Sequence, residues 1–211
     1  MQMKRWNPFA KPELWIFAGP NGAGKSTAIN EIRAGNCYPI INPDIYAETL
    51  RVENPNIEAD KVAYVSSRMA LTARKELLKK RKTFGIETTF SSKHPEERLM
   101  RQAKKQGYKV TLVFIGLKTV EHSRKRVQER VNQGGHDIPL EAIYRRFPKI
   151  VANLPKAIHL SDDAQIFDNT DGQYQKILIR KKGKTVFVNE ILPEWLLPEC
   201  LEEGSEAEIA S

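Results

Sequence analysis

Eight consecutive residues combine glycines, a lysine and a serine in a pattern suited to holding phosphate groups. The segment is Gly19-Pro20-Asn21-Gly22-Ala23-Gly24-Lys25-Ser26, a complete GxxxxGK[ST] motif, with Thr27 directly after it. Glycines allow the tight turns that aim backbone N–H groups at phosphate oxygens. Lys25 offers a positive charge to the β- and γ-phosphates of a nucleotide, and the Ser26 hydroxyl can ligate Mg²⁺. We therefore predict that residues 19–27 bind ATP and Mg²⁺; a glycine-rich turn without a ligand is the less favoured alternative.

The sequence on either side of this segment supplies the elements that such a loop requires. Residues 14–18 are an apolar run with large side chains, which predicts a buried strand. Residues 26–33 have helical character, so a helix is expected to begin where the glycines end. The positive end of that helix dipole would add to the attraction for phosphate.

A carboxylate, Asp44, follows the second predicted strand, residues 38–41. Ligands of a parallel sheet lie beyond the carboxyl ends of its strands, so Asp44 is expected to face the phosphate site. There it could accept the proton of an attacking hydroxyl group and orient that group toward the γ-phosphate. The alternative is a structural one, in which residues 42–44 form a turn or cap a helix that starts at Ile45.

A second carboxylate, Glu87, lies at the end of the third predicted strand, residues 84–88. It is expected in the same crevice, where it could bind a sugar hydroxyl or a metal-bound water, and Thr88 and Thr89 after it offer hydroxyl groups. Ordinary strand-edge residues are the alternative interpretation.

Four arginines lie on two predicted helices separated by a pair of glycines. Arg126 and Arg130 are four residues apart on a helix over residues 120–132, and Arg145-Arg146 lie on the next helix. Such a pair of helices predicts a lid, residues 120–150, that closes on the transferring phosphate, because the guanidinium fork suits phosphate oxygens. Solvated surface arginines are the alternative.

Strands alternate with helices along the chain, which predicts an α/β three-layer P-loop fold with a mostly parallel sheet. The other expected elements are helices over residues 57–81, 95–106 and 140–147, the last ended or kinked by Pro148, and strands over residues 110–115 and 164–167. Residues 174–180 and 185–188 predict a C-terminal β-hairpin. The organisation is then a basic N-terminal arm (1–13), a P-loop kinase domain (14–190) and an acidic C-terminal tail (191–211).

The composition narrows the environment and the partners. The formal net charge is +8, which suits phosphate-bearing ligands and equally suits nucleic acid. Two distant cysteines imply no disulfide framework, and no targeting or membrane segment is evident, so we expect a cytoplasmic protein with no membrane partner.

Taken together, these segments resemble the zeta-toxin family of P-loop kinases. The matching segments are GPNGAGKST at residues 19–27, NPD at 42–44, IETTFSS at 86–92 and RVQERVNQGGHDIPLEAIYRRF at 126–147, followed by Asn153-Leu154 and Asp168-Asn169. Members of this family phosphorylate nucleotide sugars, typically UDP-N-acetylglucosamine, at a sugar hydroxyl. In bacterial toxin–antitoxin systems this starves cell-wall synthesis, and a small antitoxin protein covers the ATP site.

The resemblance also implies roles for individual residues. By the family pattern, Lys25 and Ser26 hold ATP and Mg²⁺, and Asp44 is the catalytic base. Glu87 and Thr89 position the acceptor. Among the lid arginines, Arg130 or Arg126 and one of Arg145 or Arg146 stabilise the transferring phosphate.

Two other functions stay open on the sequence alone. The P-loop, the aspartate and the positive charge also fit a polynucleotide or nucleoside kinase, although no aromatic platform for stacking bases is evident. A nucleotide-dependent binding module would keep ATP binding and lack transfer chemistry.

Overall fold

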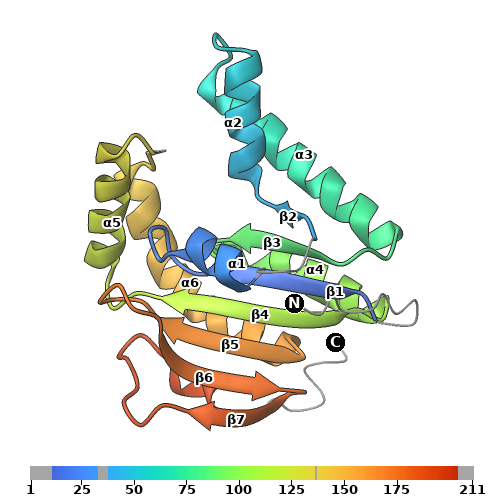
Figure 1. The fold of residues 1–211 in the computed structure, drawn as a ribbon, viewed down its shortest axis with the longest axis vertical. Helices are drawn as coiled ribbons and strands as arrows, with labels where there is room; N and C mark the ends of the chain where they lie inside the picture. Colours follow the sequence, from blue (N-terminus) through green and yellow to red (C-terminus); the bar gives the residue numbers. More distant parts are fainter. Residues whose placement is uncertain (1–10, 33–37, 136, 204–211) are drawn as a thin grey trace, which may run out of the picture.

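The structure, a computed structural model, describes residues 11–32, 38–135 and 137–203. They form a seven-stranded sheet in the order β2-β3-β1-β4-β5-β6-β7 (Figure 1). The parallel strands are β1 (Glu13–Ala18), β2 (Ile40–Ile41), β3 (Phe84–Thr88), β4 (Lys109–Gly116) and β5 (Asp163–Asp168). The antiparallel strands β6 (Gln175–Lys181) and β7 (Lys184–Val188) complete the sheet. The predicted mostly parallel sheet with a C-terminal hairpin is confirmed.

Helices cover both faces of this sheet. They are α1 (Lys25–Ile32), α2 (Pro43–Glu53), α3 (Ala59–Lys79), α4 (Lys93–Lys105), α5 (Val120–Asn132) and α6 (Leu140–Leu160), with a short 3₁₀-helix at Pro198–Cys200. Helix α1 packs on one face through Ile29, which contacts Phe17 and Val113 in a small core cluster. Helices α4 and α6 pack on the opposite face and contribute to the main core. The arrangement is the predicted three-layer fold.

Helix α6 corrects a prediction. The helix was expected over residues 140–147, ended or kinked by Pro148, whereas it runs from Leu140 to Leu160 with Pro148 and Pro155 inside it. Each internal proline removes a backbone hydrogen bond and costs about 3 kcal/mol. The second half of the helix nevertheless buries an apolar face against the sheet, including Ile150 and Leu154, and this burial offsets the cost.

The second strand is shorter than the predicted residues 38–41. Pro39 has no N–H group to give to the sheet, so the ladder with β3 includes only Ile40 and Ile41. Helix α2 starts directly afterwards at Pro43, with Asn42 as its N-cap: the Asn42 side chain accepts a hydrogen bond from the Asp44 N–H at 2.9 Å. The capping interpretation of this segment is therefore correct, and because Asn42 caps the helix, the Asp44 carboxylate is left for other contacts.

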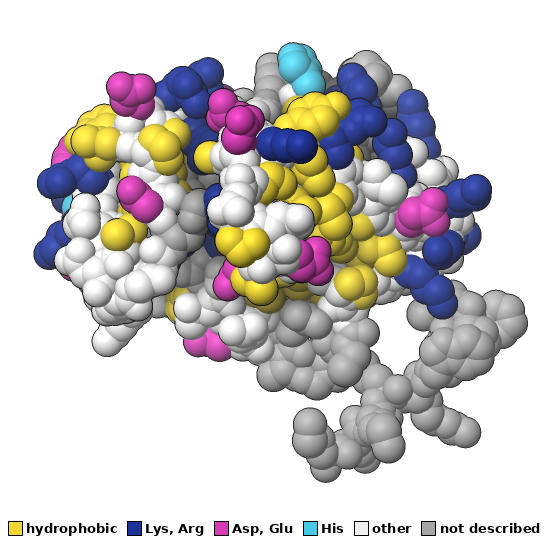
Figure 2. All heavy atoms as spheres, turned by 90° about the horizontal axis from the view of Figure 1, so that it is seen from above, with side chains coloured by type: hydrophobic (Ala, Val, Ile, Leu, Met, Phe, Trp, Pro, Cys, Tyr) yellow, Lys and Arg dark blue, Asp and Glu magenta, His cyan; other side chains and the backbone are white. Residues whose placement is uncertain are grey.

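Helices α2 and α3 pack against each other and project from the sheet beside α5 and α6 (Figure 1). Seen from above, hydrophobic side chains show on this α2–α3 pair, and the surface is hollowed between it and the α5–α6 pair (Figure 2). Exposed apolar side chains of the pair include Val52 and Tyr64.

The segment predicted as an acidic C-terminal tail contributes to the core as far as Leu201. Trp195 and Cys200 are buried, and the Trp195 indole N–H donates to Asp168 Oδ2 at 2.5 Å. Residues 204–211 of that segment, and residues 1–10 of the predicted N-terminal arm, lie outside the described residues.

Candidate active site

The glycine-rich loop lies between β1 and α1, as predicted. Gly19, Gly22 and Gly24 have φ angles of 139°, 73° and 91°, which side-chain-bearing residues rarely adopt. A Cβ atom on Gly24 would also lie 2.8 Å from Asn169 Nδ2 and 2.7 Å from the Tyr174 hydroxyl. Both the backbone conformation and the available space therefore require glycine at this position.

Three side chains from distant segments fasten this loop through its carbonyl oxygens. Ser123 Oγ donates to Asn21 O at 2.7 Å, Asn169 Nδ2 to Ala23 O at 2.9 Å, and the Tyr174 hydroxyl to Gly24 O at 2.7 Å. Ser123 and Tyr174 could not be predicted from the sequence, because no motif connects them to the loop. Only Asn169 had a signal, as part of Asp168-Asn169 after a short strand.

Lys25 lies inside the loop with only 7% of its surface exposed. Its ammonium group donates to Gly19 O at 3.0 Å and Pro20 O at 2.9 Å. Burial lowers the pKa of Lys25 from 10.5 to about 8, although the carboxylates of Glu87 and Asp44 act in the opposite direction. A bound polyphosphate would supply the negative charge that favours the protonated ammonium.

Ser26, Glu87 and Asn42 are joined by hydrogen bonds at the start of α1. Ser26 Oγ donates to Glu87 Oε1 at 3.2 Å, and Asn42 Nδ2 donates to Glu87 Oε2 at 3.1 Å. A hydroxyl and a carboxylate are the hard oxygen ligands that Mg²⁺ prefers. Within the described ranges there is no group of three His, Cys, Asp or Glu side chains that could hold a metal ion. The donors thus fit a Mg²⁺ ion shared with nucleotide phosphates and water, the usual arrangement for this ion.

A cavity of about 300 Å³ opens over the loop. Its lining contains most of the predicted site: Asn21, Gly22, Gly24, Lys25, Ser26, Thr27, Asn42, Asp44, Glu87, Thr88, Thr89, Arg126 and Arg130. The remaining loop residues do not line it: Gly19 and Pro20 face Lys25 with their carbonyl groups, and Ala23 is fully buried.

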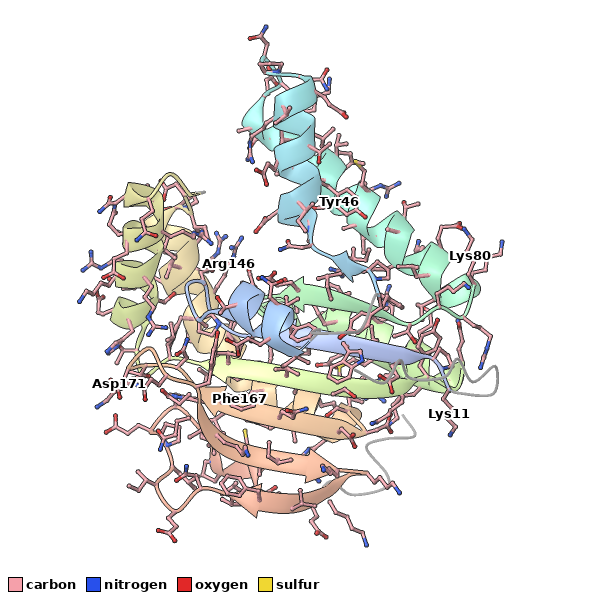
Figure 3. All side chains as sticks on the ribbon, in the orientation of Figure 1. Lys11, Tyr46, Lys80, Arg146, Phe167 and Asp171 are labelled. Carbon is pink, nitrogen blue, oxygen red and sulfur yellow. The ribbon has the colours of Figure 1, made fainter. Side chains whose placement is uncertain are left out.

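A second cavity, of about 720 Å³, adjoins the first. Both are lined by Asp44, Glu87 and Thr89, so the two cavities meet at these side chains. The second one extends between α2 and α3 on one side and α6 on the other. Arg146, labelled in Figure 3, lines it from α6.

The four lid arginines divide between the two cavities. Arg126 and Arg130 line the first, where Arg126 Nη2 also donates to Thr170 O at 3.0 Å. Arg145 and Arg146 line the second. The two groups of arginines, from which one member each was predicted to stabilise the transferring phosphate, therefore line two adjoining cavities.

None of the helices in the described ranges has the length and apolar character needed to cross a membrane.

The fold and this site define the class of the protein, which is a P-loop kinase. The family model for the zeta toxin matches residues 1–190, and the chain belongs to this family. An uncharacterized protein of Haemophilus influenzae is 30% identical over 144 residues, which cover 65% of this chain and 99% of that protein.

Solved structures of other proteins share the fold. The PezAT chromosomal toxin–antitoxin system of Streptococcus pneumoniae matches with a TM-score of 0.57 and 21% identity, over 79% of this chain and 71% of that one. The AvrRxo1-ORF1:AvrRxo1-ORF2 complex with ATP gives a TM-score of 0.58 and 17% identity, over 84% and 60%. A putative kinase from Chloroflexus aurantiacus gives a TM-score of 0.52 and 17% identity, over 64% and 76%.

Proposed function

We propose that this protein transfers the γ-phosphate of ATP, with Mg²⁺, to a hydroxyl group of a UDP-sugar such as UDP-N-acetylglucosamine. The observation that carries the proposal is the meeting of two cavities at Asp44 and Glu87. One cavity contains the phosphate-binding loop, and the other has room for a second substrate. An acceptor in the second cavity would present its hydroxyl group where the two spaces join.

Each residue at this junction has a chemical role in the proposal. Asp44 accepts the proton of the attacking hydroxyl group and orients it in line with the γ-phosphate. Lys25 and Arg130 stabilise the negative charge of the transferring group from the ATP side, and Arg145 does so from the acceptor side. Ser26 and Glu87 would hold Mg²⁺, which would supply positive charge to offset the negative charge of the nucleotide phosphates. Thr89 helps to place the acceptor.

The charges around the second cavity support a phosphate-bearing acceptor. Arg145, Arg146 and Lys149 line it from α6, and Arg51 lines it from α2. Clustered cations attract a diphosphate and raise its local concentration. Family membership supports the same class of acceptor, and we propose that the activity is cytoplasmic, where ATP is available.

The toxin–antitoxin complex among the structural relatives supports a further part of the proposal, a protein partner. We propose that an antitoxin covers the ATP cavity. Such a protein should reduce ATP binding in proportion to its own occupancy, which a competition titration would measure.

The direct test is transfer of label from γ-labelled ATP to a panel of UDP-sugars, nucleosides and oligonucleotides. Asp44→Asn should lower kcat by about 100-fold or more, because the variant loses the general base, while the KM for ATP stays within about threefold. Glu48→Gln is the matched control: it lies one turn further along α2, is exposed and lines neither cavity.

Three other outcomes would change the conclusion. Undiminished transfer by Asp44→Asn would remove the catalytic base from the mechanism. Label on an oligonucleotide would favour a polynucleotide kinase. Binding of ATP without transfer to any acceptor would favour a nucleotide-dependent binding module.

A further inference from the structure

A buried arginine in the wall of the second cavity has no hydrogen-bond partner among the residues that the structure describes. Arg74, on α3, is 8% exposed and lines this cavity. It donates no hydrogen bond to any residue that the structure describes, and its Nε atom is completely covered. Burial lowers the pKa of its guanidinium group. A buried charge without partners is unfavourable, so its retention points to a ligand rather than to the fold.

The carboxylate of Glu96, which interacts electrostatically with Arg74, also has one oxygen without a hydrogen-bond partner among the described residues. Glu96, on α4, is 7% exposed; its Oε1 atom accepts a hydrogen bond from Thr88 Oγ1 at 2.9 Å, and its Oε2 atom has no partner among the described residues. Its carboxylate acts on the Arg74 pKa, yet the two side chains do not form an ion pair within 4.0 Å. A donor and an acceptor thus lie unpaired in the same wall.

This pair occupies a different part of the cavity from the cations of α6. Arg74 and Glu96 come from α3 and α4, whereas Arg145, Arg146 and Lys149 all come from α6. Thr88, which holds Glu96, also lines the ATP cavity, so the pair lies close to the junction of the two spaces.

We propose that Arg74 and Glu96 bind the glycosyl part of the acceptor, while the α6 cations bind its phosphates. This inference rests on the proposed function. Because the pair carries no net charge, it suits a neutral group that presents an acceptor and a donor side by side. Two neighbouring sugar hydroxyls, or a secondary amide on the sugar, have this chemistry. Arg74 donates to an oxygen of that group, and Glu96 Oε2 accepts its O–H or N–H.

The melting temperature of variants distinguishes a ligand-binding role of Arg74 from a role in stabilising the fold. The double variant Arg74→Met/Glu96→Gln removes both buried charges together and leaves neither uncompensated, so it should melt within about 2 °C of the wild type or above it. A structural role would predict a clear fall in the melting temperature. Glu96→Gln keeps the shape of the side chain and an oxygen for Thr88, and it loses only the second carboxylate oxygen.

The experiment is calorimetric titration of the full chain with UDP-N-acetylglucosamine, UDP-glucose and UDP. Arg74→Met and Glu96→Gln should each weaken UDP-N-acetylglucosamine binding by about tenfold or more, because a hydrogen bond to a charged group is lost. UDP, which has no glycosyl group, should bind each variant within about twofold of the wild type. Arg68→Met, an exposed arginine on the same helix, is the control and should change neither.

The arms of the experiment separate the competing explanations. Weakening of both UDP-sugars supports recognition of hydroxyls, and weakening of UDP-N-acetylglucosamine alone supports recognition of the amide. Equal weakening of UDP would assign Arg74 to the phosphates and overturn the proposal, as would unchanged binding of all three ligands. If the wild type binds UDP but neither UDP-sugar, the proposed acceptor is wrong. If the wild type binds the UDP-sugars and the two variants bind them equally well, only the role of Arg74 and Glu96 is wrong.

Discussion

The low pKa of Lys25 predicts that ATP binding is accompanied by proton uptake. In the nucleotide-free protein, burial lowers this pKa to about 8. The charge of a bound triphosphate favours the ammonium form and raises the pKa again. At pH 8 the free protein holds roughly half a proton on Lys25 and the complex holds a full one, so binding should take up about half a proton.

Titration calorimetry with Mg·ATP in two buffers of different ionisation enthalpy measures this uptake. The observed heat should differ between the buffers at pH 8 by about half the difference in their ionisation enthalpies, and by about a tenth of it at pH 7. Equal heats in both buffers at pH 8 would refute the reasoning, because they would show that Lys25 is already fully charged before ATP binds.

The same pKa predicts how stability depends on pH. Between about pH 8 and 10.5 the unfolded chain holds more protons at Lys25 than the folded one, so the free energy of unfolding rises with pH in this window. Below about pH 8 the buried ammonium destabilises the folded protein by its full cost, roughly 3 kcal/mol. Relative to Lys25→Met, the wild type should gain about 2 kcal/mol of unfolding free energy from pH 7 to pH 9.5. Parallel denaturation curves for the two proteins would contradict this.

Two glycine substitutions test the loop and the sheet. Gly24→Ala should raise the KM for ATP by about tenfold, because the new methyl group displaces side chains that fasten the loop. Gly183→Ala in the β6–β7 hairpin is the control, with φ of 75° and no atom within 4 Å of the new methyl group. It should strain the backbone similarly and leave this KM unchanged, and an equal effect of both substitutions would contradict the argument. The new methyl group of Gly116→Ala would overlap the Trp195 indole. The substitution should therefore lower the unfolding free energy by about 1–3 kcal/mol in a denaturant titration, with ATP binding retained. An unchanged denaturation midpoint would exclude this contact.

Much of the catalytic side of the molecule could be predicted because its signals are local. Phosphate binding requires glycines, a lysine and a serine in one short segment between a strand and a helix, and residues 19–27 contain all of them. Asp44 and Glu87 could be placed in the same crevice because the carboxyl ends of parallel strands meet at one edge of the sheet. The alternation of strands and helices was enough to predict the fold class.

The sequence by itself thus determined the phosphate loop, the two carboxylates beside it and the class of sheet that carries them. Only the tertiary structure decided the rest, because it depends on contacts between residues far apart in the chain: Tyr174 fastens the loop from 150 residues away. Packing on the sheet carried α6 past Pro148, against the local preference of proline. The second cavity, with Arg74 and Glu96 in its wall, exists only where α2, α3, α4 and α6 come together, and no local pattern encodes such a meeting of four helices.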